Sequence, residues 1–417
     1  MAYDEATYRR QSDDDGEDPA AYRSGLTAPD YRGRRRDLDP DSGYADAQTE
    51  PLRRTSPYDD DGRDRLGFHI GWEIVLLLAV AAIAYLLYRL DPASLRRPAL
   101  DTLLISGTVI GLLTLGAGLT MRAGVPNLAI GPIALAAALH FAENGDKGLV
   151  KAAVPALAIA AVGGLVVALL MVALNVPAWA ATLGAALGVI TYIQLRVAPV
   201  DVQGGYDPSD QAFYLFGGFA SLAVIGGVLG AMPPIRRMLG RMRSSGDPAE
   251  RRGAGVAVPV IGSLVLSSVF AVAAGILMAA QSTKPIVPET GLEWTGIAFG
   301  TALLGGTSAF GRRGGIFGTL LAVAGMTLFL DYSDRRNFDI ALFAIAACAV
   351  GAGLVVTRLV ETYSKPLPGV GVDEDWNAAP STATTNWNPD LPDTWTPAVP
   401  TQPRSERWDD GPWGSAR

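Results

Sequence analysis

Side chains that could carry out chemistry are few in this sequence and lie far apart. The two histidines, His69 and His140, have no cysteine near them, and the one cysteine, Cys348, lies in an apolar run. A metal site needs several such ligands at a defined spacing, so we expect no metal site. No intramolecular disulfide can form, and we interpret Cys348 as a small buried hydrophobic residue. We expect no catalytic residue.

The sequence also lacks the residues that would power transport within this chain. A phosphate-binding loop needs a lysine directly after a glycine, and none of the four lysines follows a glycine. Ion-coupled carriers place ionisable groups deep in their spans. Here Glu73, Glu293 and Arg358 lie near span ends, and His140 and Arg196 do too. We therefore expect that this chain does not hydrolyse ATP through such a loop and that another subunit handles the energy source.

The elements that carry these residues are long apolar stretches, each long enough to cross a bilayer as a helix. They predict an all-α, polytopic membrane helical bundle of about ten spans. The predicted spans are residues 69–90, 102–121, 124–142, 149–174, 177–198, 212–232, 256–281, 292–310, 315–332 and 338–362.

The third span carries signs of a broken or re-entrant helix. It begins with Gly124-Val125-Pro126-Asn127 and contains Gly131-Pro132. Such backbone is tolerated at membrane depth only where protein buries it or where it lines a cavity. Elsewhere, the pairs Gly163-Gly164 and Gly226-Gly227 predict close packing between helices.

The two ends of the chain differ in composition from this core. Residues 1–66 carry 17 acidic and 11 basic side chains, and residues 364–417 are rich in Pro and Thr. Neither segment has enough apolar residues to offset the entropy of ordering, so we predict that both are disordered and that residues 67–363 form the transmembrane domain. The five tryptophans of the second tail serve either as docking anchors or as residues that touch the membrane surface or nothing.

Arginines between the sixth and seventh predicted spans indicate the orientation. The segment 233–255 holds Arg236, Arg237, Arg241, Arg243, Arg251 and Arg252. Because cytoplasmic loops are enriched in Lys and Arg, we place this segment in the cytoplasm, and ten spans then put both termini there. Arg96, Arg97, Arg335 and Arg336 fall outside, which is an imperfect fit.

A glycine-rich block predicts a hairpin between two spans. Gly305, Gly306, Gly311, Gly314 and Gly315 lie within eleven residues. Each glycine weakens a helix by about 1 kcal/mol relative to alanine, so a continuous helix is not expected here. We predict a helix–turn–helix hairpin at the cytoplasmic face, in which Thr307 or Ser308 satisfies backbone groups.

This block resembles a known family signature. Gly305-Gly306-Thr307-Ser308, followed by Gly311, Gly314, Gly318 and Thr319, is similar to the GGTS motif of ABC permeases of the ribose, autoinducer-2 and branched-chain amino-acid type. Val125 to Gly131 resembles that family's G-I-D-L-S-V-G turn, with Asn127 in place of the acid. Val176 to Gly184 is similar to its V-x-x-F-I-x-T-L-G helix start. The resemblance runs from about Leu112 to Val360.

The resemblance implies a permease subunit of an ABC importer for a sugar or similar small polar solute. It implies a transport subunit that is not an enzyme and has no cofactor of its own, with ATP bound by partner ATPase subunits. It also implies an extracytoplasmic solute-binding protein and a second permease copy in the bacterial plasma membrane, with lipid around them and no nucleic acid. It implies an ATPase-coupling loop at Gly246, Ala249, Glu250, Arg252 and Gly255, where Pro248 replaces the family's acid. Asn127, Gly131 and Thr182 are the residues that we expect along the substrate pathway.

Two other functions stay open on the sequence alone. The first is a divergent scaffold or sensor that keeps the permease fold and acts through its tails. The second is an ion-coupled carrier, against which the scarcity of charges within the spans argues.

Overall fold

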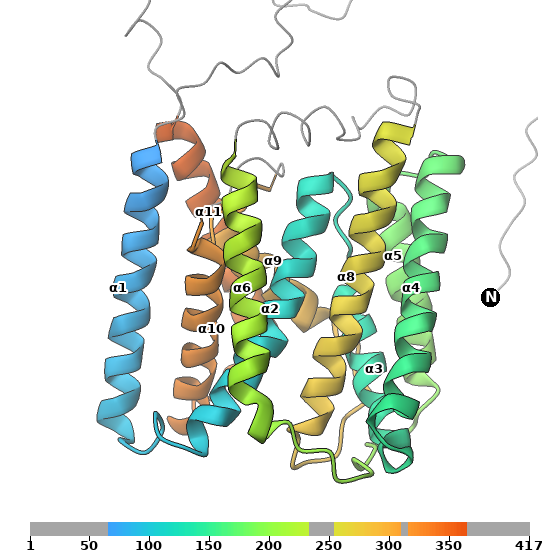
Figure 1. Ribbon diagram of the computed structural model, residues 1–417, viewed down its shortest axis with the longest axis horizontal. Coiled ribbons are helices and arrows are strands. Elements are labelled where there is room, and N and C mark those ends of the chain that lie inside the picture. The colour runs from blue at the N-terminus through green and yellow to red at the C-terminus, as the bar shows by residue number, and fades with distance from the viewer. Residues whose placement is uncertain (1–65, 233–253, 310–315, 365–417) are drawn as a thin grey trace, which may run out of the picture. The chain divides into compact units, whose positions relative to one another are not determined.

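The computed structural model describes residues 66–232, 254–309 and 316–364 (Figure 1). These residues form ten α-helices and two short 3-10 turns, with no β-strand among them. One isolated antiparallel bridge joins Val200 and Ile286. The elements are α1 (Leu66–Leu90), α2 (Ala99–Ala123), α3 (Ile130–Asn144), η1 (Gly145–Lys147), α4 (Leu149–Ala173), α5 (Ala178–Gln194), η2 (Ser209–Gln211), α6 (Ala212–Ala231), α8 (Ala254–Ala280), α9 (Leu292–Leu304), α10 (Gly318–Arg335) and α11 (Leu342–Ser364).

Six of the described helices are long and apolar enough to cross a membrane: α1, α2, α4, α6, α8 and α11. Each of the ten predicted spans overlaps one described helix, so the prediction of an all-helical membrane bundle is confirmed for these residues. Helices α5 and α9 are apolar but shorter, and α3 and α10 also fall outside the six. The count of ten crossings therefore stays a prediction. The predicted disorder of the two tails concerns residues outside the described ranges.

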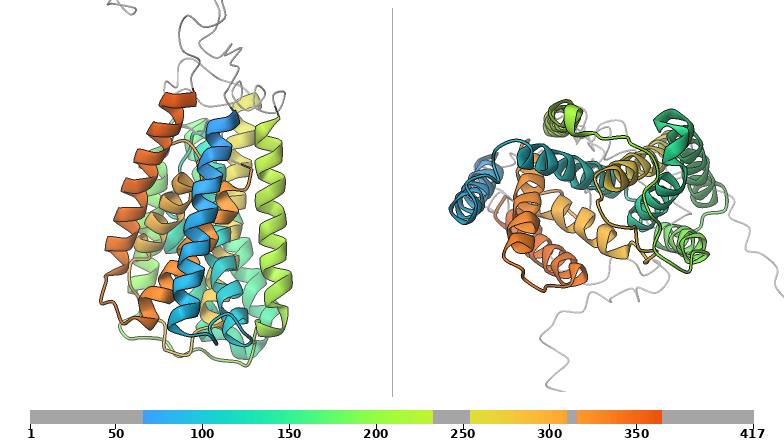
Figure 2. Two further views of the ribbon diagram at one scale, coloured as in Figure 1. Left: turned by 90° about the vertical axis from the view of Figure 1, so that its left-hand side faces the viewer. Right: turned by 90° about the horizontal axis from the view of Figure 1, so that it is seen from below.

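The helices run between two ends of the bundle (Figures 1 and 2). We call the end at which α1 begins and α11 ends the tail end; it is at the top of Figure 1, where α6 also ends and α8 begins. The opposite end, called the far end, carries the connections 91–98, 195–211, 281–291 and 336–341. The two helix ends that flank the arginine-rich segment thus lie at the tail end, together with the helix ends that lead into both tails.

Burial separates central helices from peripheral ones. The apolar windows of α2 and α8 are 67% and 61% buried, whereas that of α1 is 6% buried. Helix α8 packs against α2, α3 and α4, and α9 packs along α11. Peripheral helices that expose Leu, Val and Ile along their length are stable only in an apolar surrounding, which is what a bilayer supplies.

The two predicted glycine pairs each use one glycine for close packing. A Cβ added at Gly164 would lie 3.0 Å from the carbonyl oxygen of Leu264 on α8, while one added at Gly163 would meet nothing within 4 Å. Likewise, Gly227 abuts the backbone of Ile316 and Gly226 meets nothing. Consecutive residues face in different directions on a helix, so only one member of each pair can reach the neighbouring backbone.

The interpretation of Cys348 as a buried residue is wrong. Its side chain is exposed on α11, because the other face of that helix, with Ala346 and Ala349, is the one that packs on α9. In a membrane helix both faces are apolar, so hydropathy does not indicate which one is buried.

Candidate functional site

The third predicted span is broken, as its sequence predicts. Gly124 ends α2 with a left-handed backbone (φ 77°), and residues 125–127 have no regular secondary structure before α3 begins at Ile130. The backbone N–H of Val125 donates to the carbonyl of Thr120 at 2.9 Å. The chain thus returns into the bundle as a non-helical segment, residues 124–129, which we call the re-entrant segment.

Asn127 fastens the re-entrant segment to two neighbouring helices. Its side-chain nitrogen donates to the hydroxyl of Ser267 on α8 at 3.1 Å, and its backbone N–H donates to the hydroxyl of Thr120 on α2 at 3.3 Å. Its side-chain oxygen accepts from the N–H of Ala129 at 3.1 Å. The side chain is buried, 3% exposed, so these hydrogen bonds replace the ones that water would supply.

Gly131 lies where α3 meets the start of α9. Its N–H donates to the hydroxyl of Thr295 at 3.1 Å, and the same hydroxyl donates to the carbonyl oxygen of Leu128 at 3.2 Å. A Cβ at Gly131 would clash with the carbonyl oxygen of Gly291 and lie 2.5 Å from the backbone nitrogen of Thr295. Only glycine fits this contact.

Thr182 lies apart from these two residues, in the second turn of α5. Its hydroxyl donates to the carbonyl of Ala178 at 2.9 Å, within the same helix, and its side chain is buried. The adjacent Ala181 packs in one cluster with Val125 of the re-entrant segment. That Asn127, Gly131 and Thr182 line a solute pathway stays a prediction.

The described part of the glycine-rich block forms the two flanks of a hairpin. Gly306 ends α9 with φ 84°, where its N–H donates to the carbonyl of Leu303 and that of Thr307 to Ala302. Across the hairpin, Gly305 abuts Gly318 and lies close to the backbone of Thr319, a contact that a side chain at either glycine would prevent. Thr307 and Ser308 are buried. Gly311 and Gly314 lie outside the described residues.

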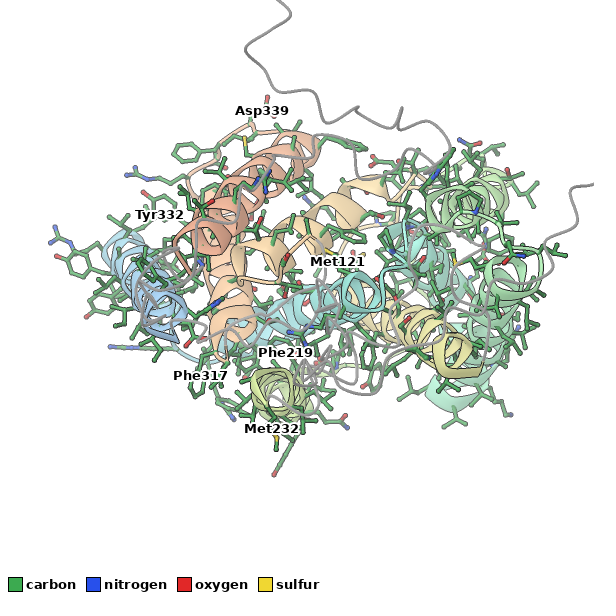
Figure 3. The ribbon with its side chains drawn as sticks, turned by 90° about the horizontal axis from the view of Figure 1, so that it is seen from above. Met121, Phe219, Met232, Phe317, Tyr332 and Asp339 are labelled. Atoms are coloured by element: carbon green, nitrogen blue, oxygen red, sulfur yellow. The ribbon has the colours of Figure 1, made fainter. Side chains whose placement is uncertain are left out.

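The re-entrant segment and the hairpin face each other across a cavity of about 330 Å³. Met121 of α2, on one side of it, lies near the centre of the bundle when viewed from the tail end (Figure 3). The structure therefore brings the re-entrant segment and the flanks of the glycine hairpin, which were predicted separately, together around this cavity. The cavity is lined by Met121, Gly124, Pro126 and Leu128 on one side and by Phe299, Leu303, Ala309 and Val350 on the other. None of these side chains can hydrogen-bond, so we assign the cavity no role in binding a polar solute.

Of the predicted ATPase-coupling loop, only Gly255 is described. It lies in the first turn of α8 at the tail end and is exposed, with nothing within 4 Å of an added Cβ. Gly246, Ala249, Glu250 and Arg252 lie outside the described residues.

Three hydroxyl side chains of this site were not predicted. Asn127 of the re-entrant segment is bonded by Thr120 and Ser267, and Gly131 of α3 is bonded by Thr295. Each of these three hydroxyl side chains is buried in an apolar helix. Hydroxyl residues within spans often bond freed backbone groups, which is the signal that could have indicated them. Among the described residues, no group of three or more His, Cys, Asp or Glu side chains could hold a metal ion.

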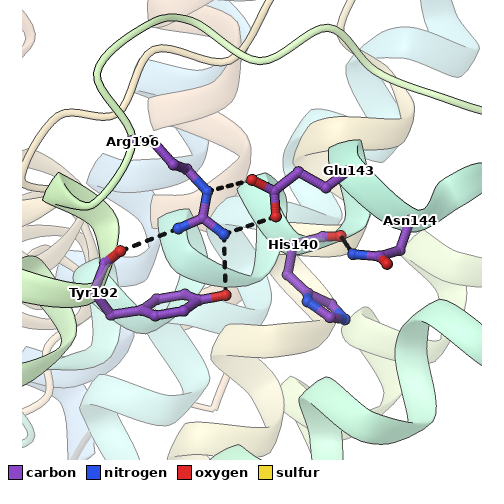
Figure 4. Close-up of polar contacts among 5 residues, drawn as sticks. All are labelled: His140, Glu143, Asn144, Tyr192 and Arg196. Carbon is purple, nitrogen blue, oxygen red and sulfur yellow. Dashed lines mark hydrogen bonds and ion pairs between the residues drawn. The ribbon is translucent and has the colours of Figure 1, made fainter.

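A charged cluster closes the far end between α3 and α5 (Figure 4). Arg196 donates to both carboxylate oxygens of Glu143, at 2.5 and 2.8 Å, and to the hydroxyl of Tyr192 at 3.0 Å. The hydrogen bonds from Arg196 lower the pKa of Glu143, and those to Glu143 raise the pKa of Arg196. A forked pair of this kind holds two helix ends in a fixed relation.

A bundle of apolar helices, six of the described ones long enough to cross a membrane, defines a multi-pass helical membrane protein. The chain is 31% identical over 270 residues to the autoinducer 2 import system permease protein LsrC of Enterobacter sp. (strain 638), a match that covers 61% of this chain and 77% of that protein. The chain belongs to the family of ABC sugar-type permeases. No protein-family profile matches it, and no solved structure does.

Proposed function

We propose that this chain is the membrane-spanning subunit of an ABC importer that translocates a sugar or similar small polar solute. The observation that carries the proposal is the match to an import permease over most of that protein's length. The matched family supplies transport subunits, so the chain carries out no covalent chemistry. Energy comes from ATP that separate ATPase subunits bind.

The tail end is the cytoplasmic end under this proposal. The helix ends that flank the six arginines of 233–255 lie there, with the ends that lead into both tails. At the far end, several arginines that do not fit the charge rule have partners. Arg97 pairs with Asp101 and stacks on Phe213, and Arg335 pairs with Asp91, directly after α1, and with Asp331 on α10. The proposed orientation rests on the six arginines of 233–255, because cytoplasmic loops carry an excess of Lys and Arg.

The ATPase docks, in this proposal, on the segment from Gly246 to Gly255. Gly255 is exposed at the tail end of α8, and α8 contacts the α2, α3 and α4 helices. A displacement of the start of α8 would therefore be transmitted to the re-entrant segment, because Ser267 of α8 accepts a hydrogen bond from Asn127.

We propose the solute and the remaining partners by analogy with LsrC. LsrC is named for the import of autoinducer 2, and we propose a polar solute of similar size for this chain. An extracytoplasmic binding protein delivers it at the far end. The exposed apolar faces of α1, α4, α5 and α6 are left for lipid and for a second permease copy.

The test is recovery of an ATPase subunit with the tagged full chain from membranes of the source organism. Glu250→Arg combined with Arg252→Glu keeps the net charge of the segment and should weaken that association. A buried interfacial charge contributes roughly 30-fold or more in affinity, and a rim charge far less. The matched control is Asp61→Arg with Arg63→Asp, an equal swap at the same spacing outside the proposed docking segment, which should leave the association unchanged.

Two outcomes would contradict the proposal in different ways. If both swaps weaken the association equally, or neither does, the segment anchors orientation and is not the docking site. If no ATPase is recovered with the unmodified chain and cells that express it take up neither labelled autoinducer 2 nor ribose, the importer function is wrong and a scaffold function replaces it.

A further inference from the structure

Helix α1 carries a single acidic residue, Glu73, two turns inside an otherwise apolar helix. The helix lies at the edge of the bundle (Figure 2) and its apolar window is 6% buried. A carboxylate within a membrane span is costly and needs partners. The proposed transport function assigns no role to this residue.

The partners of Glu73 are backbone groups of the glycine hairpin. One carboxylate oxygen accepts from the N–H of Phe317 at 2.8 Å and from that of Gly318 at 3.2 Å. These are the first N–H groups of α10, which have no acceptor within the helix. A negative charge at this position also interacts favourably with the dipole of α10.

The residue before it, Trp72, bonds the other side of the same hairpin. Its indole N–H donates to the carbonyl oxygen of Leu304, the last residue of α9, at 2.8 Å. Two consecutive side chains of α1 therefore satisfy the end of α9 and the beginning of α10 together. The indole N–H donor of Trp72 faces the carbonyl end of α9, and the carboxylate acceptor of Glu73 faces the N–H end of α10. If the two side chains were exchanged, neither helix end would gain a hydrogen bond.

The far end of α1 is tied to the same partner helix. Asp91, directly after α1, pairs with Arg335 of α10 at 2.7 Å, and Arg335 also pairs with Asp331. Helix α1 thus contacts α10 through polar groups at both ends, although little of its apolar surface is buried. The two helices are therefore joined near both ends of α1.

We propose that Trp72 and Glu73 form a latch that positions the glycine hairpin and makes α1 part of the moving unit that couples ATP hydrolysis to transport. The latch itself is a geometric assignment, and its part in coupling rests on the proposed importer function. Trp72 and Glu73 act through the hairpin and touch no solute, so they are positioning residues. Loss of the latch should lower the rate of transport without changing the affinity for solute.

The first test measures amide hydrogen exchange in the full chain, in lipid nanodiscs. Glu73→Ala should speed the exchange of peptides containing Phe317 and Gly318 by about tenfold or more, because a hydrogen bond to a charged group contributes on that order. Glu73→Gln keeps an acceptor oxygen and should restore most of the protection. Asp91→Asn, at the far end of the same helix, is the matched control and should leave these amides unchanged.

Trp72→Phe keeps the ring and removes only the indole N–H. It should expose the end of α9, seen as faster thiol modification of Ala309→Cys in a Cys348→Ala background. Unchanged exchange in Glu73→Ala, or an equal effect of Asp91→Asn, would overturn the latch.

The second test measures uptake of labelled autoinducer 2 and ribose in intact cells. Glu73→Ala should reduce the maximal rate several-fold at unchanged KM, with recovery in Glu73→Gln. A raised KM at an unchanged maximal rate, or no change in either, would overturn the role in coupling. If the unmodified chain transports neither probe, the importer function fails, and the exchange measurement still decides whether the latch exists.

Discussion

At the scale of single residues, buried hydroxyl groups take the place of water along the re-entrant segment and the start of α3. The backbone of residues 124–129 cannot bond itself as a helix does, and no water is present at membrane depth to replace those bonds. Thr120 accepts from the backbone of Asn127, and Thr295 bonds both Gly131 and Leu128. The hydroxyls therefore make a non-helical segment compatible with the membrane.

Replacing Thr295 by valine removes the bridging hydroxyl and keeps the shape of the side chain. The N–H of Gly131 and the carbonyl of Leu128 would then lose this buried partner. We expect the free energy of unfolding to fall by about 1–3 kcal/mol, measured by thermal unfolding in detergent. Thr295→Ser keeps the hydroxyl and is the control; if serine and valine destabilise equally, packing and not the hydrogen bonds explains the effect.

The far-end ion pair predicts a dependence of stability on pH. Because Arg196 lowers the pKa of Glu143 in the folded protein, the stabilisation is present above the ordinary glutamate pKa of about 4.3. It is lost as the pH falls through the lowered folded value. The carboxylate is 35% exposed, so solvent screening limits the effect to about 1 kcal/mol or less. Glu143→Gln should therefore be less stable than the wild type at pH 7.

The measurement is the difference in melting temperature between wild type and Glu143→Gln as the pH is lowered. The difference should shrink below about pH 4, where the wild-type carboxylate also becomes neutral. A difference that stays constant over this range would show that the charge of Glu143 does not contribute.

At the scale of elements, the long apolar stretches predicted where the helices lie, and glycines with a left-handed backbone end two of them, α2 and α9. The span predicted at 149–174 is the helix Leu149–Ala173, which continues through the proline at position 155. The span predicted at 292–310 ends earlier, at Leu304, because Gly306 turns left-handed. Hydropathy continues through this turn, so it could not indicate where the helix stops.

The contacts between elements were largely beyond prediction from the sequence. The glycine block and the broken crossing were predicted from their own residues, since both depend on local backbone freedom. The bond from Trp72 to Leu304 joins residues 232 positions apart, and that from Thr295 to Gly131 joins residues 164 apart. Such pairings depend on how the helices are arranged, which the pattern of a single sequence does not contain.

The paired glycines of α4 give a direct test of helix packing. Gly164→Ala places a methyl group 3.0 Å from the backbone of α8 and should destabilise the protein by about 1–3 kcal/mol. Gly163→Ala, one residue earlier, meets nothing and should be neutral or stabilising by up to about 1 kcal/mol, since alanine favours the helix. The ratio of folded to aggregated protein after heating in detergent measures both. Equal effects would show that α4 does not pack on α8 through Gly164.

At the scale of the whole molecule, charge is arranged differently at the two ends. Four described arginines of the far end have acidic or aromatic partners: Arg97 with Asp101, Arg196 with Glu143, Arg335 with Asp91, and Arg336 with Tyr332. The segment 233–255 carries six arginines and two acidic residues. Because cytoplasmic loops carry an excess of Lys and Arg, we propose that the tail end lies in the cytoplasm.

This arrangement predicts the reactivity of single cysteines in intact cells. In a Cys348→Ala background, a cysteine at Ser245, between α6 and α8, should resist a membrane-impermeant thiol reagent. A cysteine at Thr283, exposed in the far-end connection between α8 and α9, should react readily. Both should react once the membrane is made permeable, which controls for the intrinsic accessibility of each site. The reverse pattern would place the tail end outside the cell, and the segment from Gly246 to Gly255 could then not dock a cytoplasmic ATPase.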